Sequence, residues 1–520
     1  MSSSSSSLGR NSMIMAAGTA ASRVTGQVRT ILLAAALGTT GMAANAYQAG
    51  AMIPQAVFTL VSGGIFNAVL VPQIVRTLQQ KDAEERLNKL ITLAIAMLGG
   101  ITLIMAAATP LLTMLYVRGT PEMMALTNAF TLWCMPQIFF YGLYTVLGQI
   151  LAAKDHFGTY AWSSVGANLI SCAGFTAFIV LFGRSTEQPV AFWTANKLAL
   201  TAGTWTLGVA FQALILFLPL TRCGIRYRPR FGVAGIGLKS MGSVAGWSVG
   251  IVILDQLVNI ITTNITTSAP DQAHATMGLN MLDVAGNATY QNAFTLYMLP
   301  YSLIAVSVAT ALFPKISRAI ADHDIPDARD ALSQSLRSVG VLMVFFTVAF
   351  IVMPVPIILA LLPSVSVKEA MLIATPLTML GLGLPVSSAY LIIQRTFYAF
   401  EDGRTPFLFM LLFNAMFVVL VLGGAAMTSP TMWVAIVGVG SAVGHLLAFP
   451  FLIPSLRRRF EGRLDGRRIL ASYGKAIVAG SAAVIVGVLL RRPVYALLGV
   501  MSSADRAAAG SRDAAAADGG

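Results

Sequence analysis

The segment SMIMAAGTAASRVTGQVRTILLAAALG, Ser12–Gly38, has the length and apolar content of a membrane-spanning helix, yet it contains two arginines, Arg23 and Arg29. A charged side chain at the centre of a spanning helix costs about 2.5–3.5 kcal/mol on insertion scales. We therefore expect this helix to turn its arginines toward a wet or protein-lined cavity rather than toward lipid. Cations held in such a cavity indicate an anionic cargo.

The composition of the whole chain agrees with a membrane protein. The 520 residues are 56% hydrophobic and only 11% charged, with a mean hydropathy of +0.75, whereas a soluble domain has about 25% charged residues. Long apolar segments satisfy their backbone groups in lipid only as helices, so the fold class is all-α polytopic membrane protein. The serine-rich start, Ser2–Ser7, leads directly into the first span, and we expect no cleavable signal peptide.

About thirteen segments reach spanning length, and the charge of the connecting loops alternates. Loops on one side hold 23 lysines and arginines, whereas loops on the other side hold six. The positive-inside rule then places the N-terminus in the cytoplasm. A net charge of +13 would suggest nucleic acid as a partner of a soluble protein, but topology accounts for it here. The spans begin near Met13, Asn45, Leu90, Met124, Tyr160, Leu198, Val244, Ala288, Val339, Ala370, Pro406, Met432 and Ala471.

An internal repeat predicts two similar halves. AVLVPQIVR at Ala68–Arg76 matches TALFPKISR at Thr310–Arg318 with an offset of 242, and QILAAKDHFGT at Gln149–Thr159 matches RTFYAFEDGRT at Arg395–Thr405 with an offset of 246. The halves are six spans apart and therefore share one orientation, which is a design of transporters with a central site and alternating access. The predicted domains are an N-terminal lobe at 1–230, a C-terminal lobe at 231–460, an additional C-terminal helix region at 461–501 and a disordered low-complexity tail at 502–520.

The first span presents two polar stripes when it is drawn as a helix. One stripe contains Thr19, Arg23, Gln27 and Thr30, and the other contains Gly18, Ser22, Thr25 and Arg29. Arginine suits a phosphate group because its planar fork donates two parallel hydrogen bonds. The alternative is that each arginine pairs with a buried carboxylate or caps backbone carbonyls.

Polar residues in later spans extend the candidate site. Asp255 and Asn259 lie on one stripe of the seventh span, where Asp255 is either a counter-ion of the arginines, a cation or proton relay, or half of a structural ion pair. Arg395, near the cytoplasmic end of its span, either faces the cavity or extends to the interface.

Nothing in the sequence indicates an enzyme. Cys134, Cys172 and Cys223 have no metal or disulfide spacing, and the four histidines form no ligand pair. We find no nucleophile elbow, phosphate loop or paired catalytic carboxylates. We therefore expect no catalytic residue, no metal and no cofactor.

Three runs resemble the MurJ/MviN family of lipid II flippases, which belong to the multidrug/oligosaccharidyl-lipid/polysaccharide exporter superfamily. They are SRVTGQVR at Ser22–Arg29, the stretch Gly41–Val75, and RTFYAFEDGRTP at Arg395–Pro406. The resemblance implies two six-helix lobes around a central cationic cavity, one or two additional C-terminal helices that form a groove for the lipid tail, and a place in the bacterial cytoplasmic membrane. It also implies export of the undecaprenyl-pyrophosphate-linked disaccharide-pentapeptide of peptidoglycan synthesis, with Arg23 and Arg29 at the positions of the family's first-span arginines. Together with these two, we expect Asn45 and Arg395 to bind substrate.

The sequence departs from the family pattern at several cavity positions. Thr30, Asn45, Phe58, Thr59 and Thr295 stand where the family often has charged residues, so Arg23 and Arg29 carry more of the expected anion binding. Export would be driven by a coupled cation or by the membrane potential. Partners would be lipid II, membrane lipids and proteins of cell-wall synthesis or division, but no nucleic acid. The alternatives are a cation-coupled drug or solute antiporter, another polysaccharide-lipid flippase, or a scaffold for wall-synthesis enzymes.

Overall fold

In the computed structural model, helices are the only regular secondary structure among the described residues, which are all except 1, 64–73, 75–82, 155, 231–242 and 500–520. The chain divides into two compact units, Met1–Ser268 and Ala269–Gly520. The boundary lies within one long helix, α12, while the lobe limits predicted from the repeat, 1–230 and 231–460, stay a prediction. The predicted low-complexity tail lies outside the described residues, as does most of the first repeat motif.

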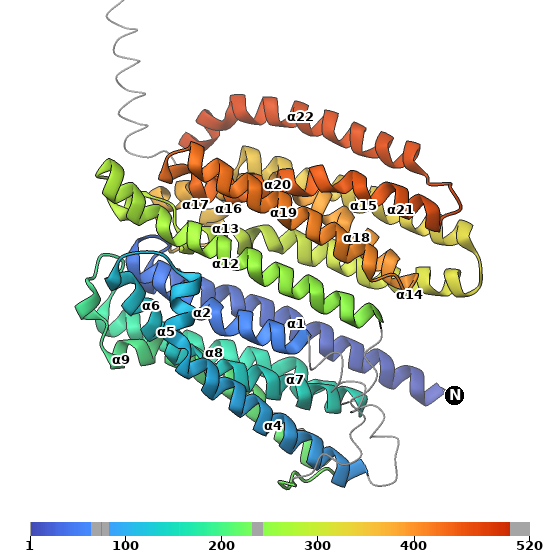
Figure 1. Ribbon diagram of the computed structural model, residues 1–520, viewed down its shortest axis with the longest axis horizontal. Helices are drawn as coiled ribbons and strands as arrows, with labels where there is room; N and C mark the ends of the chain where they lie inside the picture. The colour runs from blue at the N-terminus through green and yellow to red at the C-terminus, as the bar shows by residue number, and fades with distance from the viewer. Residues whose placement is uncertain (1, 64–73, 75–82, 155, 231–242, 500–520) are drawn as a thin grey trace, which may run out of the picture. The chain divides into compact units, whose positions relative to one another are not determined.

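The first unit consists mainly of long helices joined by short connections (Figure 1). A π-helical segment, η3 (Ala199–Gly203), joins α9 directly to α10. The helices are α1 (Ser2–Leu37), α2 (Gly41–Val61), α4 (Ala83–Ala107), α5 (Thr109–Tyr116), α6 (Pro121–Cys134), α7 (Gln137–Ala153), α8 (Phe157–Phe182), α9 (Ala195–Leu198), α10 (Thr204–Leu214), α11 (Phe217–Arg222) and α12 (Ser243–Met277).

The second unit has the same character. Its first long helix is interrupted by a π-helical segment, η5 (Tyr301–Ala305), and its last helix, α22, runs along α15 (Figure 1). The helices are α13 (Asn287–Pro300), α14 (Val306–Ala321), α15 (Ile325–Val352), α16 (Pro354–Leu361), α17 (Val367–Leu382), α18 (Leu384–Ala399), α19 (Arg404–Met427), α20 (Trp433–Ala448), α21 (Leu452–Arg459) and α22 (Gly466–Leu497).

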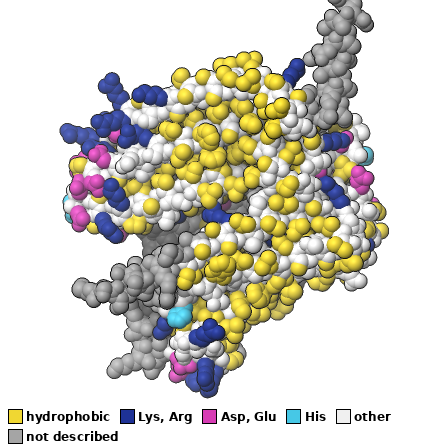
Figure 2. Space-filling view, turned by 180° about the vertical axis from the view of Figure 1, so that it is seen from behind, with side chains coloured by type: hydrophobic (Ala, Val, Ile, Leu, Met, Phe, Trp, Pro, Cys, Tyr) yellow, Lys and Arg dark blue, Asp and Glu magenta, His cyan; other side chains and the backbone are white. Residues whose placement is uncertain are grey.

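The predicted fold class is confirmed. Among the described residues, ten helices are long and apolar enough to cross a membrane, and the pair α17 and α18, bent by 47°, makes an eleventh. These match the predicted third to thirteenth spans. Of the two remaining, α1 carries Arg23, Gln27 and Arg29, which make it more polar than the other spans, and α2 ends at Val61, shortly before residues 64–73, which the structure does not describe. In Figure 2 hydrophobic side chains cover most of the middle of the visible face, and most Lys, Arg, Asp and Glu side chains lie toward two opposite sides of it, as expected of a membrane protein.

The repeat reappears in the local structure of the helices. The matched motifs place Ala153 opposite Ala399, and these are the last residues of α7 and α18. Ser62 and Gly63 are π-helical. The residues that match them at the offset of 242, Ile304 and Ala305, lie in the π-helical segment η5. The two halves therefore share helix ends and helix irregularities as well as sequence.

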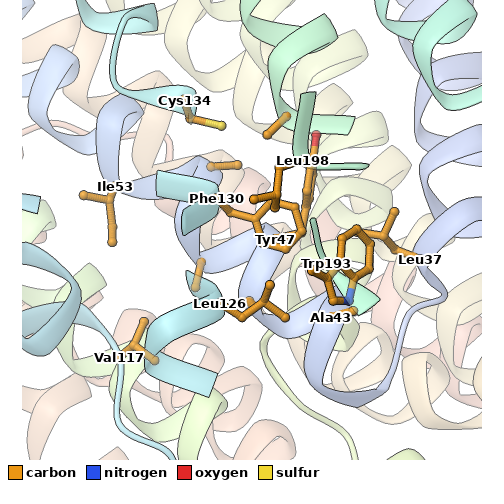
Figure 3. Close-up of a cluster of buried hydrophobic side chains, with 14 of the residues drawn as sticks. Leu37, Ala43, Tyr47, Ile53, Val117, Leu126, Phe130, Cys134, Trp193 and Leu198 are labelled. Carbon is orange, nitrogen blue, oxygen red and sulfur yellow. The ribbon is translucent and has the colours of Figure 1, made fainter. Parts of the chain in front are cut away.

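An aromatic core fixes the helices of the first unit around α2. Tyr47 is 1% exposed and lies within a cluster that includes Phe130 and Trp193 (Figure 3). The Tyr47 ring meets Phe130 edge-on at 5.3 Å and Phe175 edge-on at 6.1 Å between centroids. Each such pair contributes about 0.5–1.5 kcal/mol to stability beyond the burial of apolar area. The two ring contacts therefore fix the positions of α2, α6 and α8 relative to one another.

Candidate functional site

Helix α1 is docked on α8 through one of its two predicted stripes (Figure 1). Gly18 is buried against Ala161, where an added Cβ would lie 2.8 Å from the alanine Cβ. The Asn168 amide donates from Nδ2 to the Ser22 carbonyl at 3.1 Å and to Thr25 Oγ1 at 3.2 Å. The stripe of Gly18, Ser22 and Thr25 is therefore a packing surface as far as these residues extend.

The two arginines have different surroundings. Arg23 and its stripe neighbour Thr19 are exposed, whereas Arg29 is half-buried. Arg29 stands one turn beyond Thr25, where its guanidinium carbon lies 4.6 Å from the centre of the Trp205 ring on α10. The predicted site thus contains one exposed cation and one that is stacked on an aromatic side chain.

No carboxylate neutralises Arg29 in the part of the chain that the structure describes. Its guanidinium makes no ion pair or hydrogen bond there, and its one specific contact is the face of Trp205. Its charge also acts on the hydroxyls of Tyr47 and Tyr141 and on the thiol of Cys172. Phenols titrate near pH 10 in water, so they supply no counter-charge at neutral pH. The positive charge of Arg29 is therefore available to an anion.

The other predicted residues of the first unit lie in different environments. Asn45 is 4% exposed and interacts within the protein, so a headgroup could reach it only if it were uncovered. Asp255 is exposed on α12 and also has an interaction partner. Asn259, one turn further along, is half-buried, and its backbone carbonyl accepts a hydrogen bond from Thr263 at 2.8 Å.

Arg395 belongs to the second unit, near the end of α18. It is half-buried, and its Nε is fully buried without a hydrogen-bond partner among the described residues. Its charge acts on Tyr301 in the π-helical segment η5. A buried guanidinium N–H without an acceptor costs about 1–3 kcal/mol or more, so an anionic or polar ligand at this position would be stabilised.

Two residues near the arginines, Trp205 and Asn168, were not predicted from the sequence. The chain has six tryptophans. Trp205 lies in an apolar segment, and no periodic pattern distinguishes it from the other five. Asn168 lies mid-span in α8, where a polar residue could have been noticed as a helix–helix contact. Both act through residues far away in the chain, which a single sequence does not reveal.

The second unit contains an apolar groove of about 680 Å³. Helices α15, α18, α20 and α22 line it, with one residue of α17, and its walls are mainly valine, leucine and isoleucine. Three glycines let α22 approach α15 closely: Gly340 meets the Tyr473 ring, Gly480 meets Val344 and Val348, and Gly487 meets Val352. A groove of this size is within the range of ligand sites.

Among the described residues, no group of three histidine, cysteine, aspartate or glutamate side chains is placed to hold a metal ion. Arg29, with its ring contact to Trp205 and no ion pair in that part of the chain, suits a phosphate-bearing molecule.

Comparison with known families decides the identity. Residues 33–506 match the family model described as "Lipid II flippase MurJ". The chain belongs to the MurJ family of lipid II flippases. The match starts after Arg23 and Arg29, so the assignment does not depend on the two arginines.

Similar MurJ proteins occur in distant bacteria. The chain is 24% identical over 400 residues to a probable lipid II flippase MurJ of Rhizobium tropici, covering 75% of this chain and 70% of the relative. It is 25% identical over 416 residues to one of Synechocystis, covering 78% and 74%. This MurJ chain is therefore a multi-pass bacterial membrane protein.

Solved structures agree on the fold. A lipid II flippase MurJ in an inward closed conformation is similar with a TM-score of 0.69 at 17% identity, covering 94% of this chain and 99% of that one. An inward-facing MATE transporter of the MOP superfamily gives 0.59 at 14% identity, covering 89% and 95%. The predicted family and fold are confirmed.

Proposed function

We propose that the chain moves lipid II across the bacterial cytoplasmic membrane, with Arg29 and Arg23 binding the pyrophosphate of its headgroup. The single observation that carries this role of the arginines is the Arg29 guanidinium, which lies over the Trp205 ring and has no carboxylate partner among the described residues. A charge-assisted hydrogen bond is about twice as strong as a neutral one. A diphosphate offers several oxygens to the planar forks of both arginines.

The physical problem of flipping is the headgroup. The prenyl tail can stay in lipid throughout, whereas a pyrophosphate, two sugars and a peptide cannot cross hydrocarbon. Fixed donors such as Arg29 replace the water that the diphosphate loses. We propose alternating access as the means of exposing this headgroup to each side in turn, with the N-terminus in the cytoplasm as the loop charges predict.

The apolar groove of the second unit gives the tail a place to lie. Its valine, leucine and isoleucine walls match a prenyl chain, and each buried methylene group contributes about 0.8 kcal/mol. Arg395, with its buried and unpaired Nε, is proposed as a further polar contact for substrate. Asp255 and Asn259 are proposed to bind a coupling cation, and the membrane potential is the other candidate for the driving force.

The test replaces arginines in a flippase-depleted bacterial strain and measures the exposure of lipid II at the outer leaflet. Wild type should restore exposure, whereas Arg29→Ala and Arg23→Ala should each reduce it about tenfold or more, the effect of losing a charged hydrogen bond of about 1.5–3 kcal/mol. Arg458→Ala, which changes an exposed arginine at the end of α21, is the matched control and should behave as wild type.

The same experiment separates this proposal from a cation-coupled antiporter of the superfamily. Normal lipid II exposure in the Arg23→Ala, Arg29→Ala double variant, at normal membrane levels, would contradict the proposed role of the arginines. If Asp255→Asn then abolished function while the arginines were dispensable, the antiporter alternative would be favoured.

A further inference from the structure

An arginine that binds an anion must be fixed in position without being neutralised. It must be held in one place to bind an anion, but the usual holding group, a carboxylate, would cancel its charge and occupy its hydrogen-bond donors. In this structure the Arg29 guanidinium lies over the face of Trp205 at 4.6 Å instead. An aromatic ring is not a counter-ion, and the five N–H groups of Arg29 bond to no described residue, so they stay available to an anion.

We propose that Trp205 is the positioning residue of the anion site: it fixes the Arg29 guanidinium by stacking and leaves its charge and donors to the substrate. The inference rests on the proposed function, because it assumes that Arg29 binds the pyrophosphate. Trp205 acts through Arg29 and need not touch the substrate.

Trp205 can position another group because it is itself fixed. Its ring stacks on Tyr47 at 5.9 Å between centroids with an interplanar angle of 22°. Tyr47, in turn, is almost fully buried and held edge-on by Phe130 and Phe175. The contacts thus run from the aromatic core through Tyr47 and Trp205 to Arg29, and they join α2, α10 and α1.

The backbone supports the same arrangement at both ends of the Arg29–Trp205 contact. Trp205 is the second residue of α10, directly after the π-helical segment η3. A π turn inserts one residue into a helix, which rotates the following side chains by about 100° relative to an uninterrupted helix. On the other side, Asn168 bonds α1 at Ser22 and Thr25, one turn before Arg29.

The experiment measures binding of undecaprenyl pyrophosphate, which has the diphosphate and tail without the sugars, to purified full-length protein. Trp205→Leu keeps apolar volume but removes the ring face, and we expect the dissociation constant to rise roughly 2- to 30-fold, the range of a cation–π contact. Trp205→Phe keeps a smaller ring face and should lie between wild type and Trp205→Leu. Trp162→Leu, at a 47% exposed tryptophan of α8, is the control and should bind as wild type.

A double-mutant cycle with Arg29→Gln decides whether Trp205 works through the arginine. We expect the Arg29→Gln, Trp205→Leu double variant to bind no more weakly than Arg29→Gln alone. Additive losses would overturn the inference, as would unchanged binding in Trp205→Leu when Arg29→Gln is impaired. Unchanged binding in Arg29→Gln itself would instead contradict the proposed function.

A spectroscopic signal gives an independent check. The fluorescence of Trp205 should change when a diphosphate binds the guanidinium that lies on its ring. The change on adding undecaprenyl pyrophosphate should disappear in Trp205→Phe, although that variant still binds. An undiminished fluorescence change in Trp205→Phe would show that another tryptophan reports the binding. It would contradict the proposed contact between Trp205 and the anion-binding Arg29.

Discussion

Arg23 and Arg29 are six residues apart on one helix, and their surroundings differ. Arg29 is half-buried and lies against an aromatic ring, whereas Arg23 is exposed and has its own interaction within the protein. A cation that is already fixed loses little side-chain entropy when it binds an anion, whereas a free arginine side chain loses up to about 2 kcal/mol. Arg29 should therefore keep most of the binding energy of its hydrogen bonds to an anion.

A second charged residue, Asp402, provides a test of stability outside the membrane. The Asp402 carboxylate accepts hydrogen bonds from the Thr405 backbone N–H at 3.0 Å, from the Thr405 hydroxyl at 2.9 Å and from Arg459 at 2.9 Å. Burial alone would raise its pKa, but these hydrogen bonds outweigh that effect and lower the pKa below the ordinary 3.8. The interactions join the α18–α19 loop to α21.

The lowered pKa of Asp402 determines how the stability of the folded protein depends on pH. A carboxyl group with a lowered folded-state pKa stabilises the protein above its unfolded-state value, and this contribution is lost as the pH falls through the folded-state value. Asp402→Asn should lower the melting temperature at pH 7, with a cost of about 1 kcal/mol after solvent screening. The difference from wild type should shrink below about pH 4.

Thermal unfolding in detergent at several pH values measures this difference. The neighbouring Glu401→Gln, at an exposed position, is the control and should follow wild type throughout. A difference that persists unchanged at pH 3 would show that the carboxylate charge is not the stabilising feature.

The candidate site was partly predictable from the sequence, and the reason is specific to each residue. Arg23 and Arg29 could be found because a charge within an apolar span is costly. Trp205 could not, since its importance depends on a contact between residues 29 and 205. Arg395 was found as a charge, but its buried Nε became evident only from the structure. The roles of all these residues stay predictions, as do those of Asn45, Asp255 and Asn259.

At the scale of elements, the sequence predicted which helices exist better than it predicted their irregularities. The repeat motifs predicted two similar halves, and the structure adds that α7 and α18 end at matched residues. The π-helical segments η3 and η5 were not predicted, because an inserted residue leaves no mark in hydrophobic periodicity when all faces of a helix are apolar. Trp205 follows η3 directly, so this irregularity bears on the candidate site.

Close packing of α8 and α10 is an element-scale requirement of the site. Gly208 on α10 faces the backbone of α8, and an added Cβ would lie 2.4 Å from the Ala167 carbonyl oxygen. Because that atom belongs to the backbone, the helices themselves must move apart. Gly208→Ala should therefore destabilise the protein by about 1–3 kcal/mol and weaken the contact between Trp205 and Arg29.

Melting temperature and undecaprenyl pyrophosphate binding measure the two effects of Gly208→Ala. Gly99→Ala is the matched control, since no described atom lies within 4 Å of an added Cβ at that position of α4. Alanine is a better helix former than glycine by up to about 1 kcal/mol, so Gly99→Ala should be neutral or slightly stabilising. Equal behaviour of the two variants would contradict the packing argument.

At the scale of the whole molecule, lipid II has two chemically opposite ends, and the proposed function assigns a different part of the chain to each. The first unit holds an arginine with an available charge, and the second unit holds an apolar groove. We propose that the arginine binds the diphosphate and the groove binds the prenyl tail. Selectivity for the head and selectivity for the tail should then be separable by substitution.

The last prediction tests that separation at the groove. Ser481 on α22 lines the groove and is exposed, so Ser481→Phe should fill part of it without disturbing α1 or α10. Displacing two or three methylene groups from apolar contact costs about 2 kcal/mol, which is roughly thirtyfold in affinity. Transport of a lipid with the full-length undecaprenyl tail should slow accordingly, whereas an analogue with a short tail should be moved as by wild type. Val478→Phe, at a position of α22 that is 72% exposed and does not line the groove, is the control. Equal slowing of both lipids would contradict tail binding at the groove, because the short analogue carries the same diphosphate and reports on the headgroup site alone.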